Sequence, residues 1–139
     1  MAYYNKVGLL VLNSDSTKFL VCMKAKSAKD YFYLMPGGKI EKGETDVDCL
    51  IREIKEELSC KVDLSSLKFI AEYKDVAAGH PDRDVLIKLY LGNLIGVPVP
   101  SMEIKEIHWV GKEAVNDPKN SPILANKIIP DLVKKKILK

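Results

Sequence analysis

The pattern of apolar and polar residues divides the first part of the chain into short strands. Residues 5–12 and residues 18–24 are rich in apolar and β-branched side chains, which predicts two buried strands. Residues 13–16, between them, are of turn-forming types, so we expect the two strands to form a hairpin. A third, aromatic strand is predicted at residues 31–35, where Pro36 ends it.

The clearest element is an amphipathic helix at residues 46–58. Its apolar side chains recur at intervals of three and four residues, which places them on one face of a helix. Thr45 directly precedes the segment and is of a residue type that caps helix N-termini. The predicted apolar face consists of Val47, Leu50, Ile51, Ile54 and Leu58.

Strands return after this helix, and a second helix follows them. The predicted strands are residues 67–76, 85–94 and 106–110, with a loop at residues 77–83. Ser121 and Pro122 have the residue types of an N-cap and a first helical position, and Pro130 is expected to kink or split the helix that they begin. This order of elements predicts an α/β protein in which helices cover both faces of a mixed β-sheet.

The composition is that of an ordinary globular domain. Hydrophobic residues make up 47% of the 139 residues and charged residues 29%, which excludes a disordered or collagen-like chain. The length fits a single domain, residues 1–139, without repeats or linkers. A formal charge of +3 does not favour a stable nucleic-acid partner. The longest apolar runs are far shorter than the ~20 residues of a membrane span.

The cysteines indicate a reducing compartment. Cys22, Cys49 and Cys60 cannot all form disulfides within one chain, and their spacing matches no zinc motif. We therefore expect free thiols, which are typical of cytoplasmic proteins. The first residues show no basic stretch followed by a long apolar run, so no secretory signal is predicted. The expectation is a cytoplasmic protein without membrane attachment.

Three glutamates lie close together on the predicted helix. Glu53, Glu56 and Glu57 are three and four residues apart, so their side chains leave from neighbouring positions, on a face that we expect to lie opposite the apolar one. Like charges at this spacing repel by a few tenths of a kcal/mol per pair, and a hard divalent cation such as Mg²⁺ would stabilise them. For glutamates taken alone, a solvated charged face is the commoner outcome. Gly37 and Gly38, before the helix, permit a turn that could hold a polyphosphate beside the cation.

The wider spacing favours the metal site over the solvated face. Residues 38–60 follow the pattern G-x5-E-x7-R-E-U-x-E-E-x-G-U, where U is a bulky apolar residue, at nearly every position. This segment resembles the Nudix box, the signature of the Nudix hydrolases, and the Met-Pro-Gly-Gly sequence at residues 35–38 is similar to the MutT-type branch. One departure is Ser59, which stands where the family has a glycine that ends the helix in the left-handed conformation. We expect the turn to survive this change and the chemistry to be unaffected. The matching residues are Gly38, Glu44, Arg52, Glu53, Ile54, Glu56 and Glu57.

The resemblance implies a fold, an activity and a set of site residues. The fold would be the α/β/α sandwich of the Nudix type, with a mixed β-sheet between helices. The activity would be hydrolysis of a phosphoanhydride in a substrate with a nucleoside diphosphate, with Mg²⁺ or Mn²⁺ as cofactor. Arg52 would hold a glutamate by a charge-assisted hydrogen bond, and Glu44 would brace the loop before the helix. The implied metal ligands are Glu53, Glu56, Glu57 and the carbonyl of Gly38.

Further residues are candidates outside the metal ligands. Many Nudix members add a glutamate from a later loop as the catalytic base. Glu103 is the candidate for this role here, and Glu106 is the alternative. Glu103 could equally be an exposed loop residue without a catalytic role. Gly37 and Gly38 are candidates for substrate contact. Tyr33 could stack on a base, although aromatic strand residues more often belong to the core.

The substrate class stays open within the family. The MutT-like features favour a nucleoside triphosphate, (d)NTP, cut to the monophosphate and pyrophosphate, and the alternative is ADP-ribose or another nucleotide sugar. A non-catalytic nucleotide-binding module is a second class, which the complete set of box glutamates and Arg52 disfavours. An RNA-end processing enzyme is a third class. The expected partner is a small-molecule nucleotide. No membrane contact and no stable nucleic-acid partner are expected. The protein is expected to be a monomer or a homodimer.

Overall fold

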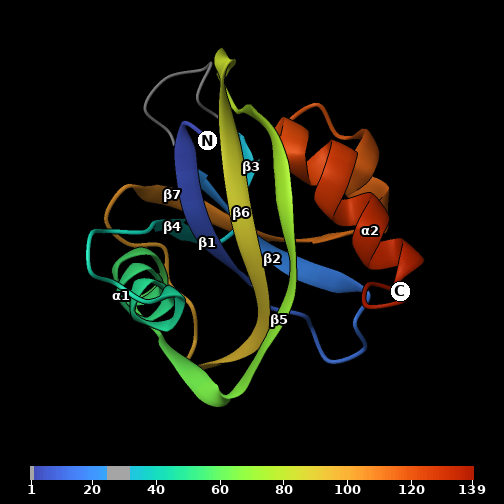
Figure 1. The fold of residues 1–139 in the computed structure, drawn as a ribbon. Coiled ribbons are helices and arrows are strands. Elements are labelled where there is room, and N and C mark those ends of the chain that lie inside the picture. The colour runs from blue at the N-terminus through green and yellow to red at the C-terminus, as the bar shows by residue number, and fades with distance from the viewer. Residues whose placement is uncertain (1, 25–31) are drawn as a thin grey trace.

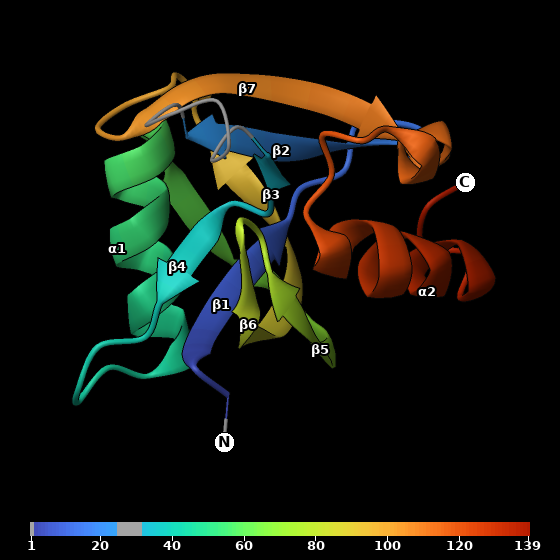
Figure 2. The same cartoon turned by 90° about the horizontal axis from the view of Figure 1, so that it is seen from above.

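A computed structural model describes residues 2–24 and 32–139 of the chain. Two β-sheets form its centre, with helix α1 (Asp46–Leu58) on one side and helix α2 (Ile129–Lys134) on the other (Figures 1 and 2). This arrangement of helices around sheets is the α/β/α sandwich that the sequence predicts. No helix in the described residues is long and apolar enough to cross a membrane.

The larger sheet has the strand order β4-β1-β6-β5 and is mixed. Strands β1 and β6 are parallel, whereas β4 and β5 pair antiparallel with their neighbours. The smaller sheet has the order β3-β2-β7 and is antiparallel throughout. The strands are β1 (Tyr4–Leu10), β2 (Lys18–Lys24), β3 (Tyr33–Leu34), β4 (Gly37–Lys39), β5 (Lys61–Ala77), β6 (His80–Ile95) and β7 (Ile104–Gly111).

The predicted hairpin of the first two strands is wrong, because β1 and β2 belong to different sheets. The turn between them does form: the N–H of Asn13 donates to the carbonyl of Lys18 over 2.9 Å, and that of Leu20 donates to Val11 over 3.0 Å. Beyond this short bridge the strands separate. Strand β1 already has a neighbour on each edge, β4 and β6, so it has no free edge for β2, which pairs with β3 and β7 instead.

The loop predicted at residues 77–83 is also shorter than expected. Strands β5 and β6 form one long hairpin whose turn is Ala78 and Gly79, and Gly79 has a φ of 74°, in the left-handed region that glycine adopts most easily. Strand β6 therefore starts at His80. The predictions for residues 18–24, 67–76, 85–94 and 106–110 fall within β2, β5, β6 and β7. The first strand ends at Leu10, two residues earlier than predicted. The strand predicted at residues 31–35 is too long, because β3 covers only Tyr33–Leu34, and its residue 31 lies outside the described residues.

Pro130 interrupts the second helix, as predicted, but the interruption is a widened turn. Residues Leu124–Ile128 form a π-helical turn, η3, in which the N–H of Ile129 donates to the carbonyl of Leu124, five residues earlier. Proline has no N–H to continue the α-helical ladder, and its ring crowds the preceding turn, so a locally widened helix accommodates it. Ser121 and Pro122 occupy the predicted N-cap and first helical positions, and the carbonyl of Ser121 accepts a hydrogen bond from the N–H of Ala125. The Ser121 hydroxyl makes no capping hydrogen bond within the described residues.

The core is divided between the two sides of the sheets. One cluster lies between the sheets and the α2 side and includes Phe19, Leu89 and Leu132. A second cluster lies under α1 and includes Leu9, Leu20 and Leu50. A short 3₁₀ helix, η2 (Lys112–Asn116), connects β7 to the C-terminal segment. Because α1 packs directly on the second cluster, its position relative to β1 and β4 is fixed.

Candidate active site

Helix α1 positions the glutamates, and both of its ends are well defined. The Thr45 hydroxyl accepts a hydrogen bond from the N–H of Asp48, and the Asp48 carboxylate accepts one from the N–H of Thr45, which completes a capping box. Ser59 ends the helix in the left-handed conformation with a φ of 55°, so the turn survives without the glycine.

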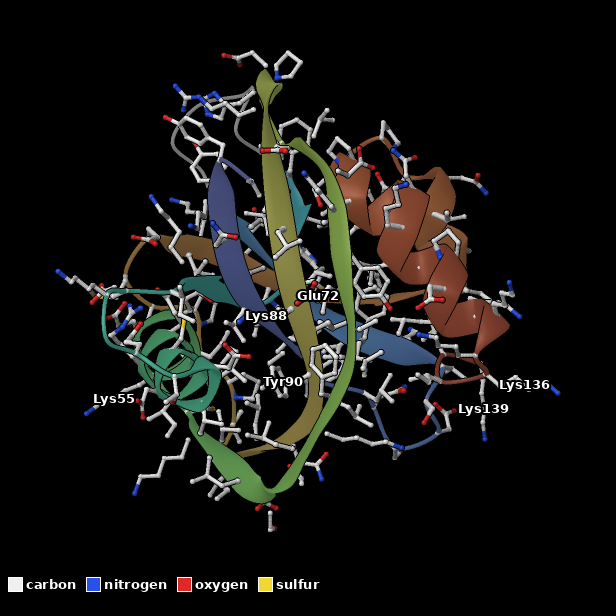
Figure 3. All side chains as sticks on the ribbon, in the orientation of Figure 1. Lys55, Glu72, Lys88, Tyr90, Lys136 and Lys139 are labelled. Carbon is white, nitrogen blue, oxygen red and sulfur yellow. The ribbon has the colours of Figure 1, made fainter. Side chains whose placement is uncertain are left out.

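The first residue of α1 is also fixed to the larger sheet. Asp46 accepts hydrogen bonds from Lys88 Nζ at 2.7 Å and from Tyr90 Oη at 2.6 Å. Figure 3 shows Lys88 and Tyr90 on β6, whereas Lys55 projects from the outer side of α1. The helix is therefore held at its start by polar contacts and along its length by apolar packing.

Contrary to the expectation from the sequence, the glutamates do not all lie opposite the apolar face. Glu57 is only 3% exposed and lies on the buried side of the helix with Leu50 and Ile54. Its Oε1 accepts a hydrogen bond from the N–H of Gly37 at 2.9 Å. Burial raises the pKa of Glu57 to about 8, although the Gly37 hydrogen bond opposes this shift.

Glu53 and Glu56 lie progressively nearer to the surface. The side chain of Glu53 is 13% exposed and that of Glu56 is 45% exposed. A Cβ on Gly38 would collide with the carboxyl group of Glu53, so this carboxylate lies directly against the glycine backbone. Burial raises the pKa of Glu53, while the charge and hydrogen bond of Arg52 act against that increase.

Arg52 connects the helix to the loop before it. Its Nε and Nη2 donate to the two carboxylate oxygens of Glu44 at 2.7 and 2.9 Å, its Nη1 donates to Glu53 Oε1 at 2.7 Å, and Nη2 also donates to the carbonyl of Lys39. The bidentate contact lowers the pKa of Glu44 to about 2. Arg52 therefore fixes the orientation of Glu53 and the path of the loop together.

The chemistry of these donors suits a hard divalent cation. Carboxylate oxygens are the ligands that Mg²⁺ and Mn²⁺ prefer, and the buried Glu57 carboxylate, with one hydrogen bond in the described residues, would be stabilised in its charged form by a nearby cation. The arrangement is not preformed: within residues 2–24 and 32–139, no group of three or more His, Cys, Asp or Glu side chains is already arranged to hold an ion. The Gly38 carbonyl faces Cys49, whose Sγ lies 3.6 Å from it.

A cleft of about 730 Å³ opens beside these residues. One half is charged and is lined by Glu53, Glu56 and Glu57 of α1, with Gly37 and Gly38 of β4. The other half is largely apolar, and its lining includes Phe32, Met35, Val85, Ile87 and Ile123. Cavities of several hundred Å³ hold cofactor-sized and nucleotide-sized ligands.

The structure separates the two candidates for a base. Glu103 lines the cleft, is half exposed and forms an ion pair with Lys24 at 3.4 Å. The loop that carries it is fixed to the end of α1, because the N–H of Val99 donates to Leu58 and that of Ser101 to Glu57. Glu106 lies on β7, where its Oε1 contacts His108 Nε2 at 2.8 Å, and it is not among the described residues that line the cleft.

Tyr33 lies in the core, the commoner outcome for an aromatic strand residue, and is not among the described residues that line the cleft, so it is wrong as a base-stacking candidate. Tyr33 is 8% exposed, packs in the core and contacts the ring of His108 edge-on at 5.7 Å. Its neighbours Phe32 and Leu34 line the cleft instead, because successive side chains of an extended strand point to opposite faces. The choice of face depends on how β3 pairs with β2, which the short aromatic sequence does not reveal.

Several residues that line the cleft are not predicted from the sequence as site residues. Lys6, Lys24 and Lys39 come from three different strands and line the same cleft. Ser121, from the segment before the C-terminal helix, also lines it, is 2% exposed, and has no hydrogen-bond partner for its hydroxyl within the described residues. Alternation along β1 could have suggested that Lys6 faces inward, but nothing in the sequence indicates Ser121.

The fold and the carboxylate helix beside the cleft define a class, the α/β/α proteins with an acidic helix next to a nucleotide-sized cavity. A family model described as the NUDIX domain matches residues 3–132. The chain belongs to the Nudix family and is a Nudix hydrolase by class, as the resemblance of residues 38–60 predicts.

Relatives of known name and structure agree with this family. The chain is 29% identical over 82 residues to an 8-oxo-dGTP diphosphatase of Proteus vulgaris, a match that covers 59% of this chain and 69% of the relative. It is 28% identical over 131 residues to an RNA pyrophosphohydrolase of Pelagibacter ubique (strain HTCC1062), and this match covers 81% of this chain and 79% of the relative. The MutT protein from Methanosarcina mazei Go1 has the same fold, with a TM-score of 0.76 at 17% identity over 97% of this chain and 96% of that one.

Proposed function

We propose that this protein is a metal-dependent pyrophosphohydrolase that cuts a nucleoside triphosphate to the monophosphate and pyrophosphate. The observation that carries the proposal is the cleft of about 730 Å³, whose lining combines the α1 carboxylates and Gly37 with apolar side chains that can contact a nucleobase. The name of the Proteus vulgaris relative, an 8-oxo-dGTP diphosphatase, supports a triphosphate substrate.

The residues have separate roles in this proposal. Glu53, Glu56, Glu57 and the Gly38 carbonyl hold Mg²⁺ or Mn²⁺, which supplies charge stabilisation to the phosphates and acidifies water. Arg52 keeps Glu53 oriented through the contact at 2.7 Å. Glu103 accepts a proton from the attacking water, and Gly37 and Gly38 allow the phosphates to approach the backbone closely. Phe32 and Ile87, in the apolar half, contact the base.

A second candidate substrate is the triphosphate end of an RNA. The observation that favours it is the match to an RNA pyrophosphohydrolase over 81% of this chain, a larger share than the diphosphatase match covers. ADP-ribose or another nucleotide sugar is the remaining alternative, because a metal ion held by the same carboxylates would also support hydrolysis of its diphosphate.

Product identification distinguishes these substrates. The protein is incubated with Mg²⁺ and, in turn, with nucleoside triphosphates, ADP-ribose and a 5′-triphosphorylated oligonucleotide, and the products are separated by chromatography. Nucleoside monophosphate with pyrophosphate supports the proposal, whereas AMP with ribose phosphate supports a nucleotide-sugar substrate. The Glu57→Gln variant and excess chelator serve as controls, and both should abolish turnover. Turnover that persists in chelator would contradict the metal requirement, and no turnover of any substrate would indicate a non-catalytic module.

A further inference from the structure

The floor of the cleft is one face of the sheet formed by β4, β1 and β6, and its side chains stand in rows across the strands. Gly8 and Gly37 are partners in one row, next to Glu57, and Lys6 and Lys39 are partners in the next. On the other side of Lys6 the partner is Ile87 of β6, which belongs to the apolar half of the cleft. Lys6 therefore lies at the boundary between the charged half and the apolar half.

Lys6 makes no ion pair or hydrogen bond within the described part of the chain, although the charges of Glu57 and Glu53 favour its ammonium form. Lys6 and Lys39 face each other on antiparallel strands, a like-charge pair that destabilises a sheet. Their Nζ atoms lie 5.7 and 5.4 Å from the centroid of the Tyr4 ring, and neither has an ion pair or hydrogen bond among the described residues. Lys24, the third lysine of the cleft, differs in this respect, because it pairs with Glu103.

Lys6 is also more buried than Lys39, its neighbour across the strands. It is partly buried, whereas Lys39 is exposed. Burial and the charge of Lys24 lower the pKa of Lys6, while Glu57 acts in the opposite direction. An ammonium group that has lost water and has an aromatic ring as its only direct partner is stabilised further when an anion binds to it.

We propose that Lys6 is a specificity-determining residue that binds the phosphate group attached directly to the nucleoside of the substrate. This inference rests on the proposed function in taking a nucleotide as the ligand. A base in the apolar half and a polyphosphate at the carboxylates place the first phosphate at the boundary between the halves, where Lys6 lies. Two residues along a strand span about 7 Å, so the Lys6 row and the Gly37 row lie within the reach of one polyphosphate chain.

Binding of nucleosides and nucleoside monophosphates tests this role without turnover or metal. Dissociation constants for adenosine, AMP, guanosine and GMP are measured by calorimetry in excess chelator for the wild type, Lys6→Met and Lys6→Arg. The matched control is Lys61→Met, which makes the same change at an exposed lysine outside the cleft. Circular dichroism and melting temperature verify that each variant is folded.

We expect Lys6→Met to weaken binding of the monophosphates by about ten- to hundredfold, because a hydrogen bond to a charged group contributes affinity in this range. Binding of the nucleosides should change by less than about twofold. Lys6→Arg should retain most of the affinity, and Lys61→Met should retain all of it. Equal weakening of nucleosides and monophosphates, unchanged monophosphate binding, or no binding to the wild type would overturn the inference. If Lys6→Met does not fold, loss of the monophosphate preference in Lys6→Gln decides the question.

The result is separable from the proposed function. A protein that binds monophosphates through Lys6 but cuts no nucleotide would refute the proposed hydrolysis and leave the role of Lys6 intact. A protein that cuts triphosphates but binds monophosphates equally well without Lys6 would refute this inference alone.

Discussion

The N–H of Gly37 donates a hydrogen bond to Oε1 of Glu57 at 2.9 Å, and this contact joins β4 to the most buried carboxylate of α1. Gly37 can make it because its backbone has a φ of 132°, and a Cβ at this position would collide with the carbonyl oxygen of Val7. The residue type at position 37 and the orientation of Glu57 are therefore linked through one short strand.

Gly37→Ala should destabilise the protein severely and abolish turnover. The new methyl group collides with the backbone of β1, which cannot move without disturbing both of its neighbours, and we expect a loss of about 3 kcal/mol in the free energy of unfolding. Gly43→Ala is the matched control, since Gly43 also has a positive φ, of 85°, but has nothing within 4 Å of the place that a methyl group would take. Urea denaturation of both variants measures the loss in the free energy of unfolding. Equal losses in the two variants would show that the positive φ alone, and not the contact with Val7, causes the destabilisation.

Glu103→Gln should lower kcat by about a hundredfold and leave KM nearly unchanged, the usual scale for the loss of a general base. Glu106→Gln is the internal control, because Glu106 lies outside the cleft and contacts His108. Steady-state kinetics on the preferred nucleotide give both parameters. A large loss in Glu106→Gln with none in Glu103→Gln would reverse the assignment, and no loss in either would indicate a glutamate of α1 as the base.

Ser59→Gly should be tolerated and raise the melting temperature slightly. Ser59 has a φ of 55°, where glycine avoids a steric cost of up to about 1 kcal/mol, although the greater freedom of glycine in the unfolded chain offsets part of the gain. Ser59→Ala should be neutral or mildly destabilising, because alanine retains the Cβ. Differential scanning calorimetry of both variants distinguishes them, and a clear decrease for Ser59→Gly would reveal a contribution of the serine hydroxyl.

Asp131 should contribute stability that depends on pH. Its carboxylate accepts hydrogen bonds from Lys135 Nζ at 2.8 Å and Tyr73 Oη at 2.5 Å, and these contacts, with Lys135 first, lower the pKa of Asp131 below its usual value. An acid with a lowered pKa in the folded state stabilises that state above its unfolded pKa, near 4, and this contribution disappears as the pH falls through the folded pKa.

The variant Asp131→Asn measures this effect. At pH 7 the free energy of unfolding of the variant should be about 1 kcal/mol below that of the wild type. The difference should shrink as the pH falls below about 4, because the carboxylate of the unfolded wild-type chain then takes up a proton that the folded chain does not yet bind. Tyr73→Phe separates the Tyr73 hydrogen bond from the Lys135 contact. A difference that stays constant between pH 7 and pH 3 would contradict an ionised Asp131 as the source of the stability.

Helix α1 shows how much of the candidate site local sequence could predict. The boundaries of α1, the capping role of Thr45 and the survival of the turn at Ser59 all follow from residues within a few positions of each other. The proximity of Glu53, Glu56 and Glu57 follows from helical periodicity, which requires no knowledge of the rest of the fold. The Nudix family itself is recognisable because its signature occupies one continuous segment, residues 38–60.

The face on which these glutamates lie was decided only by the tertiary structure. Glu57 is buried because α1 packs against β4 and β1, and the helical pattern of the sequence contains no information about which neighbouring strand covers a polar position. Tyr33 is turned into the core for the same reason, since its face depends on pairing with β2.

Long-range pairing also decided the separation of β1 from β2 and the position of Lys6. Each of these features depends on which strands lie side by side, and β1 meets β6 across about eighty residues of chain. Side-chain alternation gives a strand two faces but does not say which neighbour each edge will have, because backbone hydrogen bonds are nearly independent of side-chain identity. The sequence by itself determined the carboxylate helix and its family, and the tertiary structure determined the cleft that this helix faces.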